Sequence, residues 1–277
     1  MASKRKLKHK HLRKLASGPA KGCDVSSYQG VIDWKTLSGN AEFVIIRATD
    51  GAHFVDKYFA TNWQAARDNN IPRGAYHFFR PTQDIDEQVQ NFVSAVGALK
   101  SDDLGVVLDL EAPENWATIE ESKRVGLAVQ WLDGVEQALG VTPMIYLSPN
   151  FVAGTLGAAA APVLAKYPLW IANYNVSQPT IPSPWSTYVF WQYSDTGRLS
   201  GINGDVDLDV ASATSLADMQ SHVKKNRKTK SEIKRQSKKK KKAAKKSDKH
   251  ECSTHKCKQH KQSDKHTHSH KHECSQH

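Results

Sequence analysis

Short apolar runs alternate with amphipathic stretches through the middle of this chain. The runs are rich in β-branched residues, which is typical of buried strands, and the stretches between them carry apolar residues at spacings of three and four, which is typical of helices. Eight strands are predicted in this way, at residues 22–29 (a strand and a loop), 43–48, 74–79, 106–111, 144–147, 169–172, 189–193 and 206–210. Helices are predicted at residues 58–69, 84–99, 120–139 and 151–156, with a helical turn at 34–37.

The order of these elements predicts an α/β fold. Strands that alternate with helices favour a parallel sheet, and eight strands over about 190 residues favour closure into a barrel. The later connections are too short to hold full helices, so we expect an incomplete (β/α)8-type barrel. In such barrels the chemistry lies at the carboxyl ends of the strands.

Two carboxylates end the fourth predicted strand. Asp109 and Glu111 are two residues apart, so in a strand they point to the same face, and Leu108 and Leu110 point to the other. Burial of an unpaired carboxylate costs several kcal/mol or forces the group to take up a proton. The pair is therefore either a functional site or a strand end that lies in solvent or in salt bridges.

Three further acids fall near the same end of the predicted barrel. Asp24 belongs to the first strand, and Asp207 and Asp209 belong to the eighth, which would close against the first. Like charges that crowd one another raise the pKa of at least one member toward neutrality. A carboxylic acid that stays protonated near neutral pH is what a glycosidase needs to protonate a leaving oxygen.

Aromatic residues gather at the predicted strand ends. Each ring taken singly is more often part of the core, but rings beside carboxylates suit a sugar, which presents C–H groups on its face and hydroxyls at its edge. The candidate sugar-binding residues are Tyr28, Tyr76, Phe78, Tyr146, Trp170 and Trp191, with Tyr174 and Tyr193 in the same rim and Asp209 as a polar candidate.

Charge divides the chain into an acidic body and two basic ends. The formal net charge is +11, with 39 Lys and Arg against 28 Asp and Glu, yet residues 1–21 hold no acidic residue at all. We expect a basic N-terminal arm (1–21), a barrel domain (22–213), a Lys-rich tail (214–246) and a low-complexity tail rich in His, Cys and Lys (247–277). The tails have too few apolar residues to build a core, so we expect them to be disordered.

The last tail holds a candidate metal site. Its alternating histidines and nearby cysteines could ligate zinc, nickel or copper, but their spacing matches no standard zinc motif, so adventitious binding and a solvated basic tail are the competing interpretations. The candidate ligands are Cys252, Cys257, His266, His268, His270, His272 and Cys274. The barrel domain has a single cysteine, Cys23, so no disulfide is expected within it. We also expect no cofactor and no metal site in the barrel.

With these residues assembled, the chain resembles the glycoside hydrolase family 25 lysozymes, the Chalaropsis-type muramidases of bacteria, fungi and many bacteriophages. The resemblance covers about residues 22–213. The matching segments run in family order: GCDVSSYQG (22–30), FVIIRATDG (43–51), GAYHF (74–78), LDLE (108–111), IY (145–146), LWIA (169–172), WQYS (191–194) and VDLD (206–209).

The resemblance implies hydrolysis of the β-1,4 bond between N-acetylmuramic acid and N-acetylglucosamine in peptidoglycan. It implies that Glu111 is the proton donor and that Asp109 orients the substrate or stabilises positive charge at the anomeric carbon. Asp24 and Asp207 would hold the surrounding hydrogen-bond network, with Asp209 in place of Asp207 if the last strand is shifted by two residues. The spacing of the acids leaves retention and inversion of configuration both open.

The basic ends point to a second partner besides peptidoglycan. We expect them to dock on an anionic cell-wall polymer or on a membrane surface. The alternative functions are a carbohydrate-binding pseudoenzyme and a polyanion-binding or nucleic-acid-binding protein that works through its basic tails. The acidic body disfavours the second alternative, although the tails could still bind nucleic acid non-specifically.

The sequence also bounds where the protein is made. The first 21 residues lack an apolar run of about seven residues, so no signal peptide is predicted, and no stretch approaches the roughly 20 apolar residues of a membrane span. We expect a monomer that is made in the cytoplasm, in a phage-infected host if it is an endolysin, and that reaches the wall by lysis or through a holin-type pore.

Overall fold

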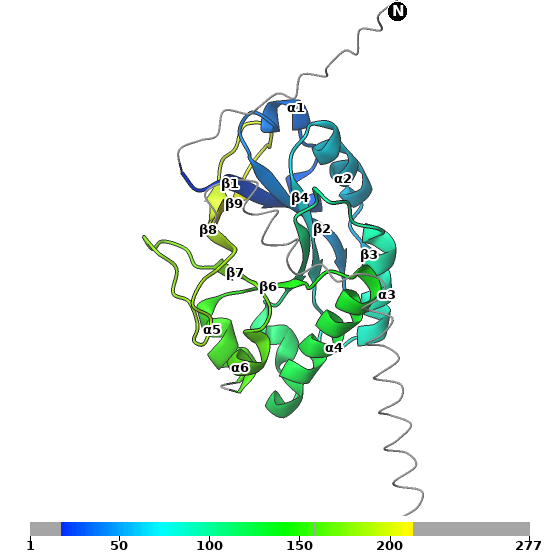
Figure 1. Cartoon of the computed structure of the whole chain (residues 1–277), viewed down its shortest axis with the longest axis vertical. Helices are drawn as coiled ribbons and strands as arrows, with labels where there is room; N and C mark the ends of the chain where they lie inside the picture. The colour runs from blue at the N-terminus through cyan, green and yellow to red at the C-terminus, as the bar shows by residue number, and fades with distance from the viewer. Residues whose placement is uncertain (1–17, 158, 213–277) are drawn as a thin grey trace, which may run out of the picture. The chain divides into compact units, whose positions relative to one another are not determined.

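Eight strands close into a barrel, with helices packed on its outside (Figure 1). The computed structural model describes residues 18–157 and 159–212, so the predictions for the two tails concern residues outside the described part of the chain. The barrel strands are β1 (Lys21–Val25), β2 (Phe43–Asp50), β4 (Arg73–Phe78), β5 (Gly105–Asp109), β6 (Met144–Leu147), β7 (Leu169–Ala172), β8 (Phe190–Gly197) and β9 (Val206–Ala211). Strand β3 (Phe54–Val55) pairs with the end of β2 and stands outside the ring.

Amphipathic helices cover the outer face of the strands. The longest are α2 (Phe59–Asp68), α3 (Ile85–Val96) and α4 (Glu121–Leu139), and α3 and α4 lie side by side (Figure 1). Each was predicted from its apolar spacing, and α4 ends at Gly140 in a left-handed conformation, as its sequence predicts. The shorter segments are α1 (Trp34–Leu37), α5 (Pro149–Phe151), α6 (Ala160–Leu164), the 3-10 turns Ser27–Gln29 and Pro113–Trp116, and the π-helical turn Val152–Leu156.

The strand order confirms the predicted closure, but one strand runs against the predicted direction. Neighbouring strands follow the order β1-β9-β8-β7-β6-β5-β4-β2, and β1 pairs with β2 to close the ring. All these pairs are parallel except those of β9, which is antiparallel to both β1 and β8. The connection of β8 to β9, residues 198–205, is too short for a crossover helix, and a short loop can join only antiparallel strands.

Alternate residues of each strand fill the inside of the barrel. Phe43 and Ile45 of β2, Trp170 of β7 and Phe190 of β8 belong to this inner core. A side chain on Gly22 would collide with it, because its Cβ would lie 2.6 Å from the ring of Phe43. The inside of the barrel is therefore a packed core and not a channel.

His77 belongs to the outer layer, although it stands in a segment that carries the family resemblance. It is fully buried, its Nδ1 lies 2.7 Å from Thr49 Oγ1, its Nε2 lies 3.0 Å from Gln88 Oε1, and its ring stacks on Trp131. Burial lowers the pKa of His77 to about 4. The residue is therefore a neutral part of the contact between β4 and the helices.

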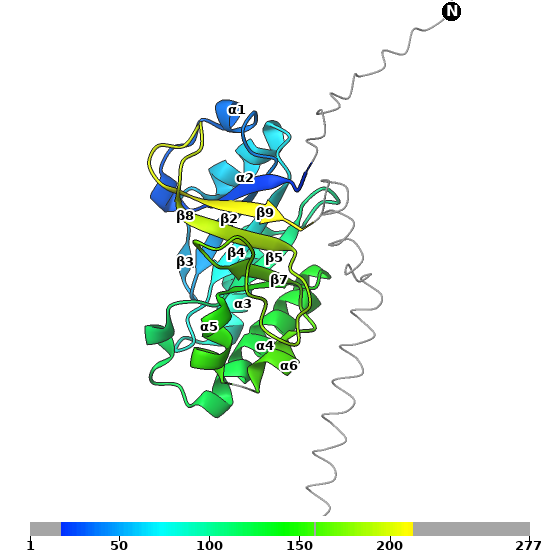
Figure 2. The same ribbon diagram turned by 90° about the vertical axis from the view of Figure 1, so that its left-hand side faces the viewer.

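The described chain begins and ends at one end of the barrel. Lys21, predicted as the last residue of the basic arm, is the first residue of β1 and pairs with Val210 of β9, as Figure 2 shows for the two strands. The Ala211 N–H donates to the Ala20 carbonyl at 2.9 Å. Because β9 runs against the parallel strands, its first residues reach the opposite end, where the parallel strands finish.

Candidate active site

The carboxyl ends of the parallel strands form the mouth of the barrel. Asp109 is the last residue of β5, and Glu111 follows just beyond the strand. Ala112 has a left-handed backbone (φ 55°) and Pro113 begins a 3-10 turn, so the chain turns away directly after Glu111. Both carboxyl groups line a cavity of about 60 Å³ at the base of the mouth. We call this cavity the floor, and its other lining residues are Asp24, Tyr76, Tyr146, Trp170, Gln192 and Asp207.

Asp109 is held in the floor with an acceptor atom free. It is 5% exposed, and its Oδ1 is buried without a hydrogen-bond partner among the described residues. Burial raises the pKa of Asp109 well above its usual value, and the charge of Glu111 raises it further. A buried oxygen that has no partner and lies beside a cavity is placed to accept a hydrogen bond from a ligand in that cavity.

Glu111 is partly buried and faces the same cavity. Burial raises the pKa of Glu111, and the charges of Asp207 and Glu114 raise it further, while Arg80 and Arg47 oppose the shift. Glu111 therefore keeps its proton to a higher pH than an ordinary glutamic acid does.

A second carboxyl pair lies across the floor. Asp24 of β1 and Asp207 of β9 stand directly opposite one another in the strand pairing. Burial raises the pKa of Asp207 to about 6 and that of Asp24 well above its usual value. Besides burial, the charges of Asp209 and Asp207 raise the pKa of Asp24.

Asp209, which the sequence analysis leaves as the alternative to Asp207, lies deeper in the barrel. It is fully buried, and it is not among the residues that line the floor. Its Oδ1 accepts the Trp170 Nε1–H at 2.8 Å, and burial raises its pKa to about 8. Asp207 is thus the member of the pair that meets the cavity, and Asp209 supports Trp170 from below.

Gln192 joins the two sides of the floor, and the sequence analysis does not include it among the site residues. Its Nε2 donates to Asp24 Oδ2 at 2.7 Å. Its Oε1 accepts the hydroxyl of Tyr146 at 2.8 Å and that of Tyr174 at 2.5 Å. Strand alternation could have identified it, because Trp191 and Gln192 must point to opposite faces of β8.

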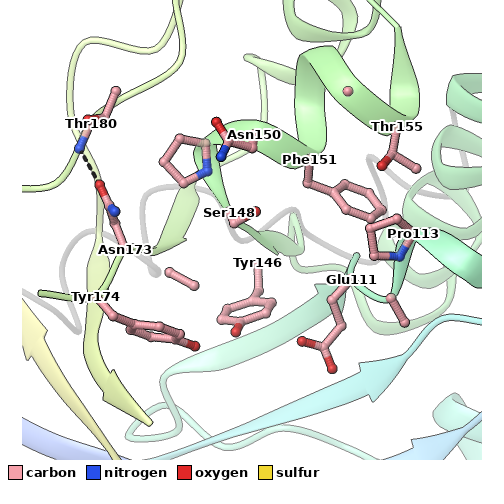
Figure 3. A pocket seen from close by; sticks show the side chains of 14 residues that line it. Glu111, Pro113, Tyr146, Ser148, Asn150, Phe151, Thr155, Asn173, Tyr174 and Thr180 are labelled. Carbon is pink, nitrogen blue, oxygen red and sulfur yellow. Dashed lines mark hydrogen bonds between the residues drawn. The ribbon is translucent and has the colours of Figure 1, made fainter.

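Two open arms lead from Glu111 across the mouth. The first, which we call the neutral arm, is a cavity of about 830 Å³, and Glu111 alone is charged among the described residues that line it. Glu111, Tyr146 and Tyr174 follow one another along one side of this arm (Figure 3). Its lining residues are Glu111, Ala112, Pro113, Tyr146, Ser148, Pro149, Asn150, Phe151, Gly154, Thr155, Ala172, Asn173, Tyr174 and Thr180.

The second arm, which we call the charged arm, is a cavity of about 380 Å³. Arg80 lies in it and binds Asp50 through two hydrogen bonds of 2.6 and 2.8 Å, with its guanidinium over the ring of Phe78. Its lining residues are Asp24, Ser26, Tyr28, Gln29, Arg47, Asp50, Tyr76, Phe78, Arg80, Glu111, Ala112, Glu114, Asn115 and Asp207.

Most of the aromatic candidates line these cavities. Tyr28, Tyr76 and Phe78 line the charged arm, and Tyr146 and Trp170 line the floor. Trp191 does not line either arm or the floor: it packs against the outer core, and its Nε1–H donates to the Asn173 carbonyl at 2.8 Å.

The candidate tail ligands lie outside the described residues. Within residues 18–157 and 159–212, no group of three or more His, Cys, Asp or Glu is placed to hold a metal ion. The helices of this part of the chain are all too short or too polar to span a membrane. Cys23 is buried with a free thiol.

Known proteins share the sequence and the fold of this barrel. The family model of the family 25 glycosyl hydrolases matches residues 23–202. The uncharacterized protein YegX of Escherichia coli strain K12 is 36% identical over 225 residues, which cover 79% of each chain. Lysozyme M1 of Streptomyces globisporus is 34% identical over 203 residues, which cover 69% of this chain and 68% of that protein. The crystal structure of the lysozyme from Streptomyces coelicolor matches with a TM-score of 0.70 at 30% identity, covering 76% of this chain and 100% of that one.

Proposed function

The chain belongs to family 25 of the glycosyl hydrolases, and from that premise we propose that Glu111 is its general acid and Asp109 the charged partner. The coarser activity follows from the family: the protein is a glycoside hydrolase of the lysozyme type and acts on peptidoglycan. The roles of individual residues are proposed from their positions in the mouth of the barrel.

The observation that carries the proposal is the position of Glu111 at the junction of the cavities. Glu111 lines the neutral arm, the charged arm and the floor. A glycan strand that lies across both arms would place one of its bridging oxygens beside this carboxyl group. Protonation of that oxygen makes the sugar a better leaving group, which is the task of a general acid.

Asp109 and Glu111 would divide the charge between them. Two carboxyl groups that interact this closely titrate as a pair, and between their two apparent pKa values the pair holds one proton. With the proton on Glu111, Asp109 is negative and stabilises the positive charge that develops at the anomeric carbon. The free Oδ1 of Asp109 would accept the N–H of the acetamido group on the sugar in the floor.

The remaining polar residues of the floor would orient this pair and the substrate. Asp24 and Asp207 lie opposite one another in the strand pairing, and Gln192 ties Asp24 to the hydroxyl groups of two tyrosines. Such a connected network keeps each side chain in one orientation, which is what positioning of a transition state requires. For contact with sugar rings we propose Tyr28, Tyr76, Phe78, Tyr146 and Trp170, which line the floor or the charged arm.

The bond that is cut can be located from the products. Digestion of purified peptidoglycan should give fragments that end in a reducing N-acetylmuramic acid. Borohydride reduction of the digest followed by mass spectrometry should therefore show the reduced muramic residue at the new ends. New ends that carry reduced N-acetylglucosamine would contradict the proposal.

We also propose that the basic ends hold the enzyme on an anionic cell envelope. Residues 1–21 hold eight Lys and Arg and no acidic residue, whereas residues 214–277 hold 20 Lys and Arg and six acidic residues. The described chain starts and stops at the end of the barrel opposite Glu111, where Lys21 pairs with Val210.

Removal of residues 214–277 should separate binding from chemistry. The rate on soluble glycan fragments should stay within about twofold of the full chain, while lysis of whole cells should fall, and the difference should be larger at low salt because salt screens the attraction. Turbidity clearing over a salt series measures this difference.

A charge-matched pair of variants controls for length. Arginine at positions 238–242, which are all lysine, should preserve lysis, and glutamine there should weaken it. Equal lysis by the full chain and the shortened chain at every salt concentration would rule out the docking role.

A further inference from the structure

Two exposed aromatic rings stand at the outer end of the charged arm. Tyr28 is 85% exposed and Phe54 is 47% exposed. They come from separate elements, since Tyr28 lies in the 3-10 turn after β1 and Phe54 lies in β3. Tyr28 is among the residues predicted from the sequence to bind sugar, and Phe54 is not.

A single arginine joins the two rings. The guanidinium carbon of Arg47 lies 5.2 Å from the centre of the Tyr28 ring and 5.7 Å from the centre of the Phe54 ring. Arg47 also lines the charged arm together with Tyr28 and Glu111. Tyr28 is therefore part of the groove, and Phe54 adjoins it through Arg47. We call Tyr28, Phe54 and Arg47 the outer rim.

Buried hydrogen bonds hold the outer rim in place from below. Asp56, which is 3% exposed, accepts the Arg47 Nε–H at 3.0 Å and the Ser27 N–H at 2.8 Å. Arg47 Nη2 donates to Ser27 Oγ at 3.0 Å. These bonds tie the turn that carries Tyr28 to the segment that follows Phe54. The chain segments that carry the two rings are therefore tied together before any ligand binds, which lowers the entropic cost of binding.

We propose that the outer rim binds the glycan strand, at a sugar beyond those that lie next to the cut bond. The inference rests on the proposed function of the groove and extends it outward from Glu111. Exposed ring faces stack on the C–H faces of a pyranose, and an apolar surface beside a groove is a common mark of a binding site.

The charges of the rim favour a neutral sugar over a charged stem peptide. Arg47 is paired with Asp56, and Arg80 in the adjoining arm is paired with Asp50. With its cation already neutralised by an acid, the rim offers apolar ring faces and no free charge of its own to recognise a carboxylate. The N-acetylglucosamine units of the strand are uncharged and have the matching chemistry.

The test compares glycan strands of different length. The substrates are long strands freed of stem peptides and the tetrasaccharide of the same repeat. In Phe54→Ala and in Tyr28→Ala, the ratio of kcat/KM on long strands to kcat/KM on the tetrasaccharide should fall by about three- to tenfold, mainly through KM, since stacking of one ring contributes about that factor. Tyr28→Phe and Phe54→Tyr keep the rings and should keep the ratio.

Val31→Ala is the matched control. Val31 is 77% exposed and lies three residues after Tyr28, but it is aliphatic and does not line the charged arm. Its removal takes away no ring face, so the ratio should stay unchanged. An unchanged ratio in both ring variants would overturn the proposal. An effect seen only with strands that still carry stem peptides would also overturn it, because the rim would then bind the peptide.

Binding alone gives a second measurement. In a Glu111→Gln background, the affinity for long strands should fall by the same factor when Phe54 or Tyr28 is replaced by alanine. If the wild-type protein released no reducing ends from either substrate, the proposed function would fail. If the wild type is active and the ring variants have the same ratio, the proposed role of the outer rim is refuted and the proposed function is not.

Discussion

Glu111→Gln is expected to slow the release of reducing ends from peptidoglycan by about 10²- to 10⁴-fold, the usual contribution of a general acid. Glutamine has nearly the same shape as glutamic acid but has no proton to give to the leaving oxygen. The fold should persist, because the pKa of Glu111 is raised by burial and by the charge of Asp207, so the native state already favours an uncharged group there. Reducing-end assays and thermal unfolding measure the two effects.

Glu114→Gln is the matched control for this variant. Glu114 is exposed, lies three residues further along the chain and also lines the charged arm. Its removal should leave the maximal rate within about threefold, because we assign the proton transfer, which contributes about 10² or more, to Glu111 and not to Glu114. Comparable losses in both variants would show that the charge of the arm matters and that no single acid donates the proton.

Asp109→Asn should lower the rate and raise the stability together. We expect kcat to fall by about 10²- to 10³-fold, because the variant lacks the negative charge that stabilises the transition state. The melting temperature should rise, since burial and the charge of Glu111 raise the pKa of Asp109. A carboxyl group whose pKa is raised by folding destabilises the native state above its unfolded pKa, and a neutral amide removes that penalty at neutral pH.

Asp209→Asn tests whether the removal of any buried carboxylate from the barrel lowers the rate as much as Asp109→Asn does. Asp209 is also fully buried, but it does not line the floor, and an asparagine there can still accept the Trp170 Nε1–H. Its kcat should fall far less than that of Asp109→Asn. A loss of activity in Asp109→Asn that tracks a loss of folded protein would contradict the proposed role.

Much of the barrel is predictable from the sequence because its strands are short apolar runs between amphipathic helices. The runs that become β2, β5 and β7 are apolar on both faces, as strands buried between an inner core and outer helices must be. The pattern of apolar and polar residues does not predict the direction of β9, because it is the same whichever way a strand runs. The short connection at residues 198–205 was the available signal for an antiparallel pair.

The floor of the site is less predictable than the fold. The spacing of residues in a strand predicts which face a side chain is on, but not how deep in the barrel it lies. Asp207 and Asp209 share one face of β9, and two residues of rise separate a residue that meets the cavity from one that lies below it. Gln192 and Trp191 differ in a way that strand alternation does predict. Adjacent residues face opposite sides, so the conspicuous aromatic ring packs outside and the inconspicuous amide lies within the floor.

The position of β9 between β1 and β8 should also affect when, during synthesis, the enzyme becomes active. Asp24 is among the first residues of the barrel to leave the ribosome and Asp207 is among the last, yet the two pair directly across β1 and β9. In a nascent chain that has not reached residue 211, β1 and β8 lack β9 as a pairing partner. The carboxyl group of Asp207 cannot yet take its place opposite Asp24. Pairing across such a separation closes late and slowly. A growing chain should therefore remain inert toward glycan until its last strand is inserted, which delays hydrolysis until the barrel is complete.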